Sequence, residues 1–410
     1  VVFSLRERLQ AQMPKWKAWL SRSLCPSSPV AQGAALCLLT FCVVLPLACH
    51  KLLYSYYYWR SLYLDSMSQA ALQESWERGQ EALRHWQAAP ATPAPGFGQE
   101  VGRGESEREG VGLLVTVVTA RREQGLQYHY LLQVALQLQG LLEACPGCAE
   151  VLVCNVEEVP RDHEDAELLK KRFRVEEKHG GGVKLPLHVP NVFEKEKRDY
   201  VYCLKRGLEL YQPRDVLMLE DDALPLDSLF PALRELRSRQ FYRGALYVKL
   251  YHPERLQRYW NPEPCRILEW LGAGGLGSSL LCLLLARARG VAPRLGLEFL
   301  FLTLYLMLVC ELAGRHYLLE LRRLSPQLLS VSPATECCTP AMLYPRAAAE
   351  RVAGYLSEVT CRKGHAKDTA LYRAVRARPW ERAYSVEPNL VRHIGAFSSV
   401  RASHPQPRLL

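Results

Sequence analysis

The sequence contains no N-x-S/T sequon and therefore offers no acceptor site for N-linked glycosylation. It also lacks the clustered basic and aromatic residues of a nucleic-acid-binding motif, so we expect no nucleic-acid partner. A single Cys-x-x-Cys motif, Cys145–Cys148, has no second copy and no paired histidines to accompany it. These absences favour a local disulfide at the motif over a zinc site or a redox centre.

Charged residues are missing from one long apolar run, Val30–Cys49, and occur only near the ends of two others, Ile267–Ala286 and Leu295–Ala313. Each run is about as long as a helix that spans a bilayer, roughly 20 residues. We predict a signal anchor at the first run and a transmembrane helical hairpin at the other two. The alternatives are a cleaved signal peptide for the first run and buried core helices for the others.

Basic residues cluster on one side of the predicted spans. They are Arg6, Arg8, Lys15, Lys17 and Arg22 before the first span, and Arg287, Arg289 and Arg294 in the turn of the hairpin. Because cytosolic loops carry an excess of Lys and Arg, both clusters predict a cytosolic position. The segments on the other side are then luminal, where an oxidising environment allows disulfides. We therefore attribute the net charge of +10 first to membrane topology.

The luminal segments alternate between strand-like and helix-like patterns. Apolar, β-branched runs predict strands at residues 112–120, 150–156, 216–219 and 244–251. Amphipathic helices are predicted between these strands and at 67–87, and a Pro, Gly and Glu-rich segment after 87 predicts a flexible linker. The alternation predicts an α/β domain with a mostly parallel sheet, which the residues after the hairpin complete.

Three adjacent acids, Glu220, Asp221 and Asp222, directly follow a predicted strand in "DVLMLEDDALP". Ligands of α/β sheets bind beyond the carboxyl ends of the strands, and carboxylates gathered there repel one another unless a cation lies among them. Such hard oxygen ligands suit Mg²⁺ or Mn²⁺, which can neutralise a leaving diphosphate. Strand alternation predicts Asp221 on the opposite side from the other two, with Asp222 as metal ligand and Glu220 near a ribose or a metal-bound water. An acidic loop that caps the next helix is the alternative.

Several long and unusual segments carry a resemblance to a known family. They are "PLACHKLLYSYYY", "FEKEKRDYVYCL", "VLMLEDDALP", "LYVKLYHPERLQRYWNPEP", "GRHYLLELRRLSP", "ECCTPAMLYP" and "VEPNLVRHIGAFSS". In this order they resemble the Golgi N-acetylgalactosaminyltransferases that modify glycosylphosphatidylinositol (GPI) anchors, within the GT-A class of nucleotide-sugar glycosyltransferases. The triplet "EDD" matches the DXD-like motif of that class, and the last segment also resembles the N-acetylglucosaminyltransferase IV family. The linker, the stretch 161–189 and "TARREQG" depart from the family pattern.

The resemblance implies a reaction and its participants. GalNAc would pass from UDP-GalNAc to a mannose of the anchor glycan on GPI-anchored proteins, with inversion and with Mn²⁺ or Mg²⁺, on the luminal side of the Golgi membrane. Inversion requires a base, for which Asp368 is the candidate, although an N-cap is its alternative role. Glu220 is the second candidate catalytic residue. His393 is expected to reach the metal or the diphosphate, with a structural histidine as the alternative.

The resemblance also places residues around the donor. They are Val118, Thr119 and Arg121 beside the uridine, Glu220 and Asp221 beside the nucleotide, and Thr339 and Pro340 beside the sugar. Cys337 and Cys338 precede the last two and either form a vicinal disulfide or have separate partners. Lys249 and His252 are expected to meet the acceptor.

These expectations divide the chain into six parts. They are a cytosolic N-terminus (1–29), a transmembrane anchor (30–49), a luminal stem and linker (50–110), a GT-A-like domain in two parts (111–266 and 314–410) and the inserted hairpin (267–313). Two other functions stay open, a glycosyltransferase with another donor or acceptor and a non-enzymatic three-span scaffold. A transporter is disfavoured because Glu269, Glu298 and Glu311 all lie near the ends of the predicted spans.

Overall fold

The computed structural model describes residues 28–90, 111–180, 189–252, 264–290 and 296–397. The chain forms two compact units, each built from two stretches of sequence. The helical unit comprises Val1–Tyr63 and Trp260–Leu318, and the sheet unit comprises Leu64–Tyr259 and Leu319–Leu410. The first basic cluster and most of the predicted linker lie outside the described residues.

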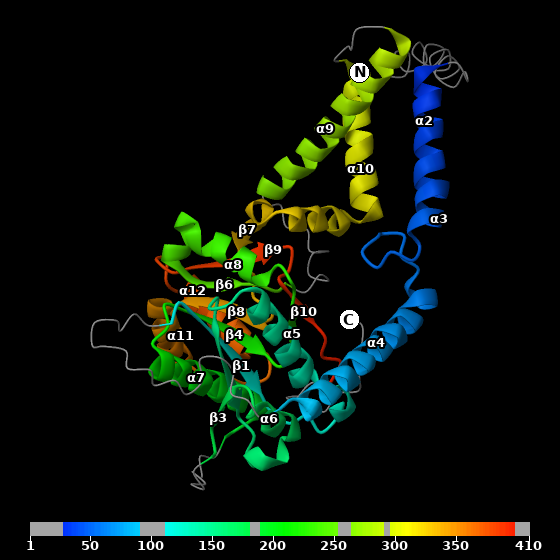
Figure 1. The fold of residues 1–410 in the computed structure, drawn as a ribbon. Helices are drawn as coiled ribbons and strands as arrows, with labels where there is room; N and C mark the ends of the chain where they lie inside the picture. Colours follow the sequence, from blue (N-terminus) through cyan, green and yellow to red (C-terminus); the bar gives the residue numbers. More distant parts are fainter. Residues whose placement is uncertain (1–27, 91–110, 181–188, 253–263, 291–295, 398–410) are drawn as a thin grey trace, which may run out of the picture. The chain divides into compact units, whose positions relative to one another are not determined.

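The sheet unit contains an eight-stranded sheet in the order β3-β2-β1-β4-β8-β6-β9-β7 (Figure 1). The strands are β1 (Leu113–Thr119), β2 (Glu150–Asn155), β3 (Arg174–Glu177), β4 (Asp215–Glu220), β6 (Ala245–Lys249), β7 (Ser330–Pro333), β8 (Ala341–Pro345) and β9 (Arg382–Glu387). Strands β3, β2, β1 and β4 are parallel, as are β6 and β9. Strand β8 runs antiparallel to β4 and β6, and β7 runs antiparallel to β9. Strands β3, β2, β1, β4, β6 and β9 therefore share one direction, so the sheet is mostly parallel as predicted, and β8 and β7 run the opposite way.

Strands from before and after the two apolar helices of residues 264–319 join in this one sheet. Strand β8 lies between β4 and β6, so the second stretch completes the centre of the sheet rather than only its edge. A second, two-stranded sheet pairs β5 (Ala223–Pro225) with β10 (Val391–His393).

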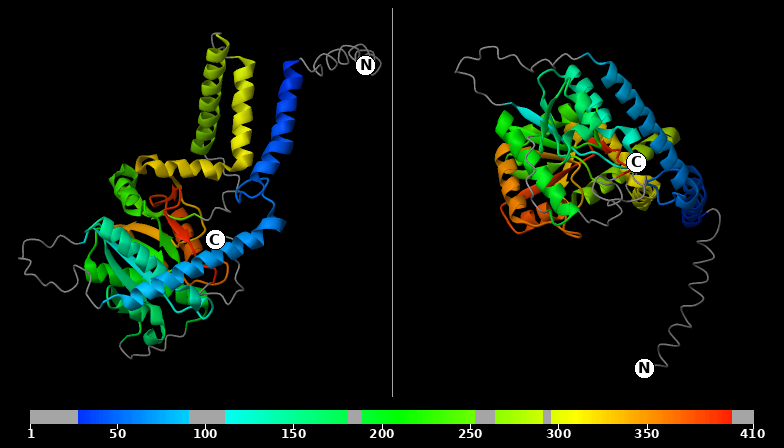
Figure 2. Two further views of the ribbon diagram at one scale, coloured as in Figure 1. Left: turned by 45° about the vertical axis from the view of Figure 1, so that its right-hand side comes forward. Right: turned by 90° about the horizontal axis from the view of Figure 1, so that it is seen from below.

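Helices cover both faces of the large sheet (Figures 1 and 2). One face carries α4 (Arg60–Ala88), α5 (Tyr130–Ala144), α6 (Glu164–Leu169) and α8 (Leu229–Ser238), and the other carries α7 (Val192–Tyr211), α11 (Arg346–Glu358) and α12 (Lys367–Arg376). Short 3₁₀ turns lie at Leu126–Tyr128, Pro160–Asp162, Gln240–Gly244, Glu320–Leu324 and Pro326–Leu328. Alternation along β4 explains the two cores, because Leu217 and Leu219 enter one and Val216 and Met218 the other.

Three disulfides connect cysteines of the sheet unit. Cys145 and Cys148 form the predicted local bridge, and the neighbours Cys337 and Cys338 form a vicinal one. Cys154 of β2 bonds to Cys203 of α7, at a sequence separation of 49. This last bridge ties the second strand to the helix that leads into β4.

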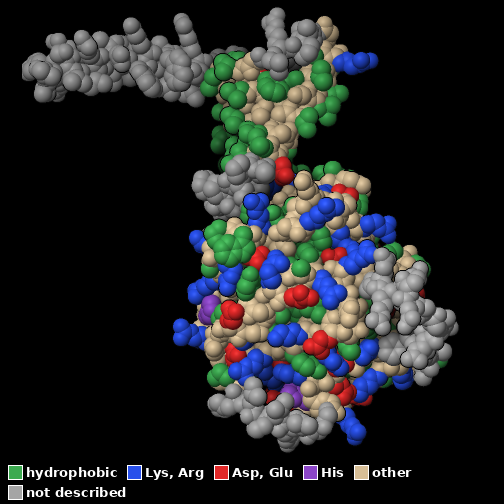
Figure 3. Space-filling view, turned by 90° about the vertical axis from the view of Figure 1, so that its left-hand side faces the viewer, with side chains coloured by type: hydrophobic (Ala, Val, Ile, Leu, Met, Phe, Trp, Pro, Cys, Tyr) green, Lys and Arg blue, Asp and Glu red, His purple; other side chains and the backbone are tan. Residues whose placement is uncertain are grey.

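Within the described residues, the helical unit holds three helices that are long and apolar enough to cross a membrane, as in a multi-pass membrane protein. The first, Pro29–Cys49, runs through α2 (Pro29–Leu39), a π-helical turn (Thr40–Val44) and α3 (Leu45–Cys49), and the others are α9 (Pro264–Arg289) and α10 (Leu297–Leu319). Their hydrophobic side chains point outward, whereas charges of both signs are interspersed over the sheet unit (Figure 3). Leu276 of α9, for example, is 75% exposed. An outward apolar surface of this kind suits a lipid environment.

Small residues let these helices approach closely. A Cβ added to Gly274 of α9 would lie 2.6 Å from Met307 Cγ of α10, and one added to Gly277 would lie 2.9 Å from Leu306 Cδ1. The contacts advance in opposite directions along the two helices, which makes them antiparallel. Thr40 of the first span meets Tyr305 of α10 at 2.6 Å between hydroxyl oxygens.

Candidate active site

Loops of the sheet unit converge at one edge of the large sheet. Strands β4 and β6 point the same way because each is antiparallel to β8, and β1, β2 and β9 are parallel to them. All five strands therefore end at this edge, which we call the carboxyl edge. Strand β8 starts there, so Thr339 and Pro340 lie at the same edge, and the Pro340 carbonyl accepts a hydrogen bond from Glu220 N (2.8 Å). The acidic triplet therefore meets the predicted sugar-pocket residues.

The two aspartates share one arginine. Strand β4 ends at Glu220, and Asp221 and Asp222 lie in the turn before β5. The Arg122 guanidinium donates from Nη2 to Asp222 Oδ2 (2.8 Å) and to Asp221 Oδ1. All three side chains are buried. The predicted separation of Asp221 from Asp222 is therefore wrong, because the alternation of a strand does not continue through a turn.

A hydrogen-bonded chain leads from Asp221 back to the end of β1. The Thr119 hydroxyl donates to Asp221 Oδ2 (2.9 Å) and contacts His163 Nε2 (2.7 Å). Because the single hydroxyl proton goes to Asp221, His163 must donate from Nε2. Burial lowers the pKa of His163, which agrees with a neutral ring. Neither Arg122 nor His163 was predicted from the sequence, although Arg122 stands in the unusual segment "TARREQG".

The segment after β10 closes over Asp222. His393 Nε2 lies 3.5 Å from Asp222 Oδ2, and Ile394 N donates to the Asp222 carbonyl (2.9 Å). A Cβ on Gly395 would lie only 2.0 Å from Asp222 Oδ2. Only glycine lets the backbone approach the carboxylate this closely. The Arg122 guanidinium also donates to the Phe397 carbonyl, so one side chain holds both the acids and this segment.

One oxygen of Asp222 is available for a cation. Oδ1 is buried and has no hydrogen-bond partner in the structure. Although burial raises the pKa of Asp222, Arg122 and His393 outweigh it and hold the pKa below its ordinary value. Among the described residues, no three His, Cys, Asp or Glu side chains are grouped to hold a metal. The residues thus fit a cation bound by Asp222 and His393 whose other ligands come from substrate and water, as is usual for Mg²⁺.

Glu220 belongs to a different ion-pair network from the aspartates. Lys367 Nζ lies 2.8 Å from both Glu220 Oε1 and Glu196 Oε1. The Lys367 side chain is 5% exposed, and its ammonium lies 4.9 Å from the centre of the Tyr200 ring. Lys367, which sequence analysis also missed, therefore joins β4, α7 and the start of α12.

Asp368 follows Lys367 and holds the vicinal disulfide. Its Oδ2 accepts from Cys338 N (3.2 Å), and its Oδ1 accepts from Thr369 N (2.7 Å). Helix α12 begins at Lys367 with Ala366 at the N-cap position, so Asp368 is not the N-cap. The candidate base thus lies at the carboxyl edge, beside the loop that carries the vicinal disulfide.

Lys249, at the end of β6, holds the same loop through its side chain. Its ammonium donates to the carbonyls of Thr335 (2.6 Å) and Cys337 (2.7 Å), and burial lowers its pKa to about 8. The residue is only 1% exposed, so the prediction that it contacts an acceptor is wrong. His252 is buried as well, with Nε2 3.1 Å from Thr335 Oγ1.

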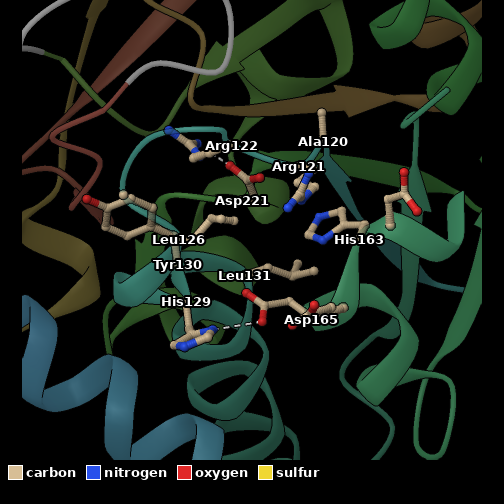
Figure 4. Close-up of a pocket in the computed structure, with 13 residues that line it drawn as sticks. Ala120, Arg121, Arg122, Leu126, His129, Tyr130, Leu131, His163, Asp165 and Asp221 are labelled. Carbon is tan, nitrogen blue, oxygen red and sulfur yellow. Dashed lines mark hydrogen bonds and ion pairs between the residues drawn. The ribbon is translucent and has the colours of Figure 1, made fainter. Parts of the chain in front are cut away.

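A cavity of about 80 Å³ opens beside the end of β1 (Figure 4). Its lining includes Arg121, Arg122, Tyr130, His163, Asp165 and Asp221. Arg121 N donates to Glu157 Oε2 (3.0 Å), which fixes the turn after β1. On the opposite wall, His129 Nδ1 lies 2.8 Å from Asp165 Oδ1. The predicted uridine neighbours Thr119 and Arg121 therefore flank or line this cavity, whereas Val118 packs against the core on the α7 face.

The family model described as "GPI-N-acetylgalactosamine transferase PGAP4" matches residues 113–392. The chain belongs to this family. The match begins with β1, ends within β10 and runs across α9 and α10. It confirms the resemblance noted above and identifies the chain as a member of a glycosyltransferase family that acts on GPI-anchored proteins.

In this member of the PGAP4 family, most predicted site residues come together although they lie far apart in sequence. At the carboxyl edge lie Thr119, Arg121, Glu220, Asp221, Asp222, Thr339, Pro340, Asp368 and His393. The contacts divide them into three groups. One surrounds Arg122, one surrounds Lys367, and one surrounds the vicinal disulfide.

Proposed function

We propose that this PGAP4-family chain transfers GalNAc from UDP-GalNAc to a mannose of the GPI glycan, with inversion and with Mn²⁺ or Mg²⁺. We further propose that the sheet unit is a GT-A-type domain split by a transmembrane hairpin and located in the Golgi lumen. The observation that carries the proposal is the unpartnered Asp222 Oδ1 beside His393, at a sheet edge of a chain from this family. Membership of the family supports GalNAc as the sugar and a GPI glycan as the acceptor. The residues at the carboxyl edge support metal-assisted transfer.

The charges at the edge favour a divalent cation. The two ion-pair networks contain four carboxylates and two cations: Glu196, Glu220, Asp221 and Asp222 with Arg122 and Lys367. With its groups ionised, the network around Arg122 carries one negative charge in excess beside the unpartnered Asp222 Oδ1, and a bound cation would offset it. When bound, such a cation would neutralise the leaving diphosphate as a Lewis acid. Asp222 and His393 are the residues that would hold it.

The donor nucleotide is assigned to the cavity beside β1. A base there would lie against the backbone after Thr119 and near the neutral His163, which offers a hydrogen-bonding ring nitrogen. Arg121 would contact the nucleotide from the same wall. Thr339 and Pro340, joined to Glu220 through the Pro340 carbonyl, would border the sugar.

Asp368 is assigned as the base that accepts the proton of the attacking mannose hydroxyl. Two backbone N–H groups fix the orientation of its carboxylate and leave lone pairs on both oxygens to accept a proton. The alternative is a purely structural role in holding the vicinal disulfide.

The test incubates the purified full chain with a panel of UDP-sugars, with and without Mn²⁺, and measures hydrolysis and transfer to a GPI glycan. We expect UDP-GalNAc to be used fastest and chelation of the cation to stop turnover. Preference for another UDP-sugar would refute the assigned donor. Full activity after chelation would refute the requirement for a metal. If the chain bound no UDP-sugar, the glycosyltransferase assignment would be refuted in favour of a non-enzymatic scaffold.

A further inference from the structure

Helix α10 is interrupted close to its end. Gly314 has a φ of 124° between two helical segments, a conformation that residues with a side chain rarely adopt. The helix from Leu297 to Ala313 is roughly 25 Å long, close to the thickness of the hydrocarbon core. The kink therefore comes where a membrane-spanning helix would leave the hydrocarbon.

The loop after the first span stabilises this kink. The Leu312 carbonyl, just before the kink, accepts hydrogen bonds from Tyr56 N (3.1 Å) and from the Ser55 hydroxyl (2.8 Å). A Cβ on Gly314 would lie 2.9 Å from the Tyr317 ring, which packs against the turn. The ends of the first and third spans are thus joined at one height within the helical unit.

Aromatic residues mark this height as a membrane interface. Tyr56 is 62% exposed and Trp59 is 60% exposed, in a segment rich in tyrosine. Tyr and Trp are enriched where a protein meets the headgroups of a bilayer. The chain that follows Gly314 therefore starts at the headgroup level.

The next residues, 315–328, which we call the exit segment, expose an apolar row. Leu321, Leu324 and Leu328 are 58%, 81% and 52% exposed, and Tyr317 before them is 38% exposed. Leu321 and Leu324 lie three residues apart in the 3₁₀ turn Glu320–Leu324, and Leu328 ends the next turn, Pro326–Leu328.

The polar side of the exit segment is anchored to the sheet unit. Arg323 Nη1 donates to the Asn389 carbonyl (2.7 Å). Arg239, at the end of α8, donates to the carbonyls of Leu329 (2.8 Å) and Gln327 (2.9 Å). The segment is therefore held through its polar side, which leaves the leucines facing outward.

We propose that the exit segment lies in the headgroup plane of the bilayer with its leucines in contact with lipid. A second protein is disfavoured as the occupant, because the segment continues directly from a membrane span and starts at its aromatic belt. Arg315 and Arg322 add positive charge that suits anionic headgroups. A span that continued straight to Leu324 would instead place Arg315, Glu320 and Arg322 in or near the hydrocarbon, which costs several kcal/mol.

The test uses the full chain in nanodiscs of phosphatidylcholine and phosphatidylserine. A photo-crosslinking amino acid replaces Leu324 in one variant and Trp380 in a matched control. Trp380 is apolar and 72% exposed, but it lies outside the exit segment, just before β9. Both side chains are exposed, so neither replacement removes core packing.

We expect several-fold more lipid adducts at position 324 than at position 380, measured by mass spectrometry of the crosslinked peptides. The same excess is expected when the crosslinker replaces Leu321 or Leu328. Equal yields at 324 and 380 would overturn the proposal. Crosslinks from 324 to a second copy of the chain would overturn it as well.

Discussion

Replacing Asp222 by asparagine should remove the oxygen that we propose binds the cation and keep the size of the side chain. The asparagine carbonyl can still accept from Arg122 (2.8 Å in the wild type), which turns its NH₂ group toward the site of the unpartnered Oδ1. An NH₂ group does not bind a cation, and one negative charge is lost beside it. Losing about 3–4 kcal/mol of transition-state stabilisation corresponds to a fall in turnover of roughly 10²–10³-fold.

Folding should change much less than turnover in this variant. Arg122 keeps its ion pair with Asp221, so we expect Asp222→Asn to cost about 1 kcal/mol of stability. The matched control is Asp215→Asn, at the opposite end of the same strand. Asp215 is buried, accepts from the Tyr242 hydroxyl (2.7 Å) and pairs with Arg237 (2.6 Å). Its loss should cost at least as much stability, about 1–3 kcal/mol, with transfer intact.

The assay compares both variants with the wild type in detergent. It measures initial rates of UDP-GalNAc hydrolysis and transfer at saturating Mn²⁺, together with melting temperatures. We expect the control to melt at the lower temperature and to stay active. Near-normal turnover by Asp222→Asn, or an equal loss in both variants, would show that Asp222 does not bind the cation.

Three further predictions concern single side chains. Asp368→Asn should lower turnover far more than UDP binding, whereas equal losses in both would indicate a structural role. Lys249 has a pKa of about 8 when folded and 10.5 as its ordinary value, so the unfolded chain binds more protons between these pH values. Relative to Lys249→Met, the free energy of unfolding of the wild type should therefore rise by up to about 3 kcal/mol as pH rises through that window. A difference in melting temperature that does not change with pH would contradict this. In Gly395→Ala, the new Cβ should push the segment after β10 away from Asp222 and lower the Mn²⁺ affinity measured by calorimetry. The control Gly354→Ala, whose new Cβ has no atom within 4 Å, should keep the wild-type affinity. Equal Mn²⁺ affinities in the two variants would contradict this prediction.

Features that depend on neighbouring residues could be predicted from sequence. The strands at 113–119 and 215–220 follow from runs of apolar and β-branched residues, and the three apolar helices follow from long apolar runs with few charges. The Cys145–Cys148 bridge follows from its spacing. The site at Glu220–Asp222 follows from acids placed directly after a strand. In each case the decisive residues lie within one element, so local physics is sufficient.

Features that depend on contacts between elements distant in sequence could not be predicted from the local pattern of residues. The residue pattern does not predict that β8 enters the sheet antiparallel between β4 and β6. Lys249 resembles an exposed cation by residue type, yet the loop that follows β7 encloses it. Its position at the end of a central strand, rather than any motif, made it structural.

Local sequence was sufficient to predict acids at the end of β4 and, among the described residues, three helices long and apolar enough to cross a membrane. The tertiary structure alone decided which cation neutralises which acid. Arg122 precedes Asp222 by 100 residues and Lys367 follows Glu220 by 147, yet each buries its charge against its partner. A buried charge must be paired, but any of the 52 Lys and Arg residues could satisfy that need in principle. Among the Lys and Arg residues that the structure describes, the order of the strands brings these two to the acids.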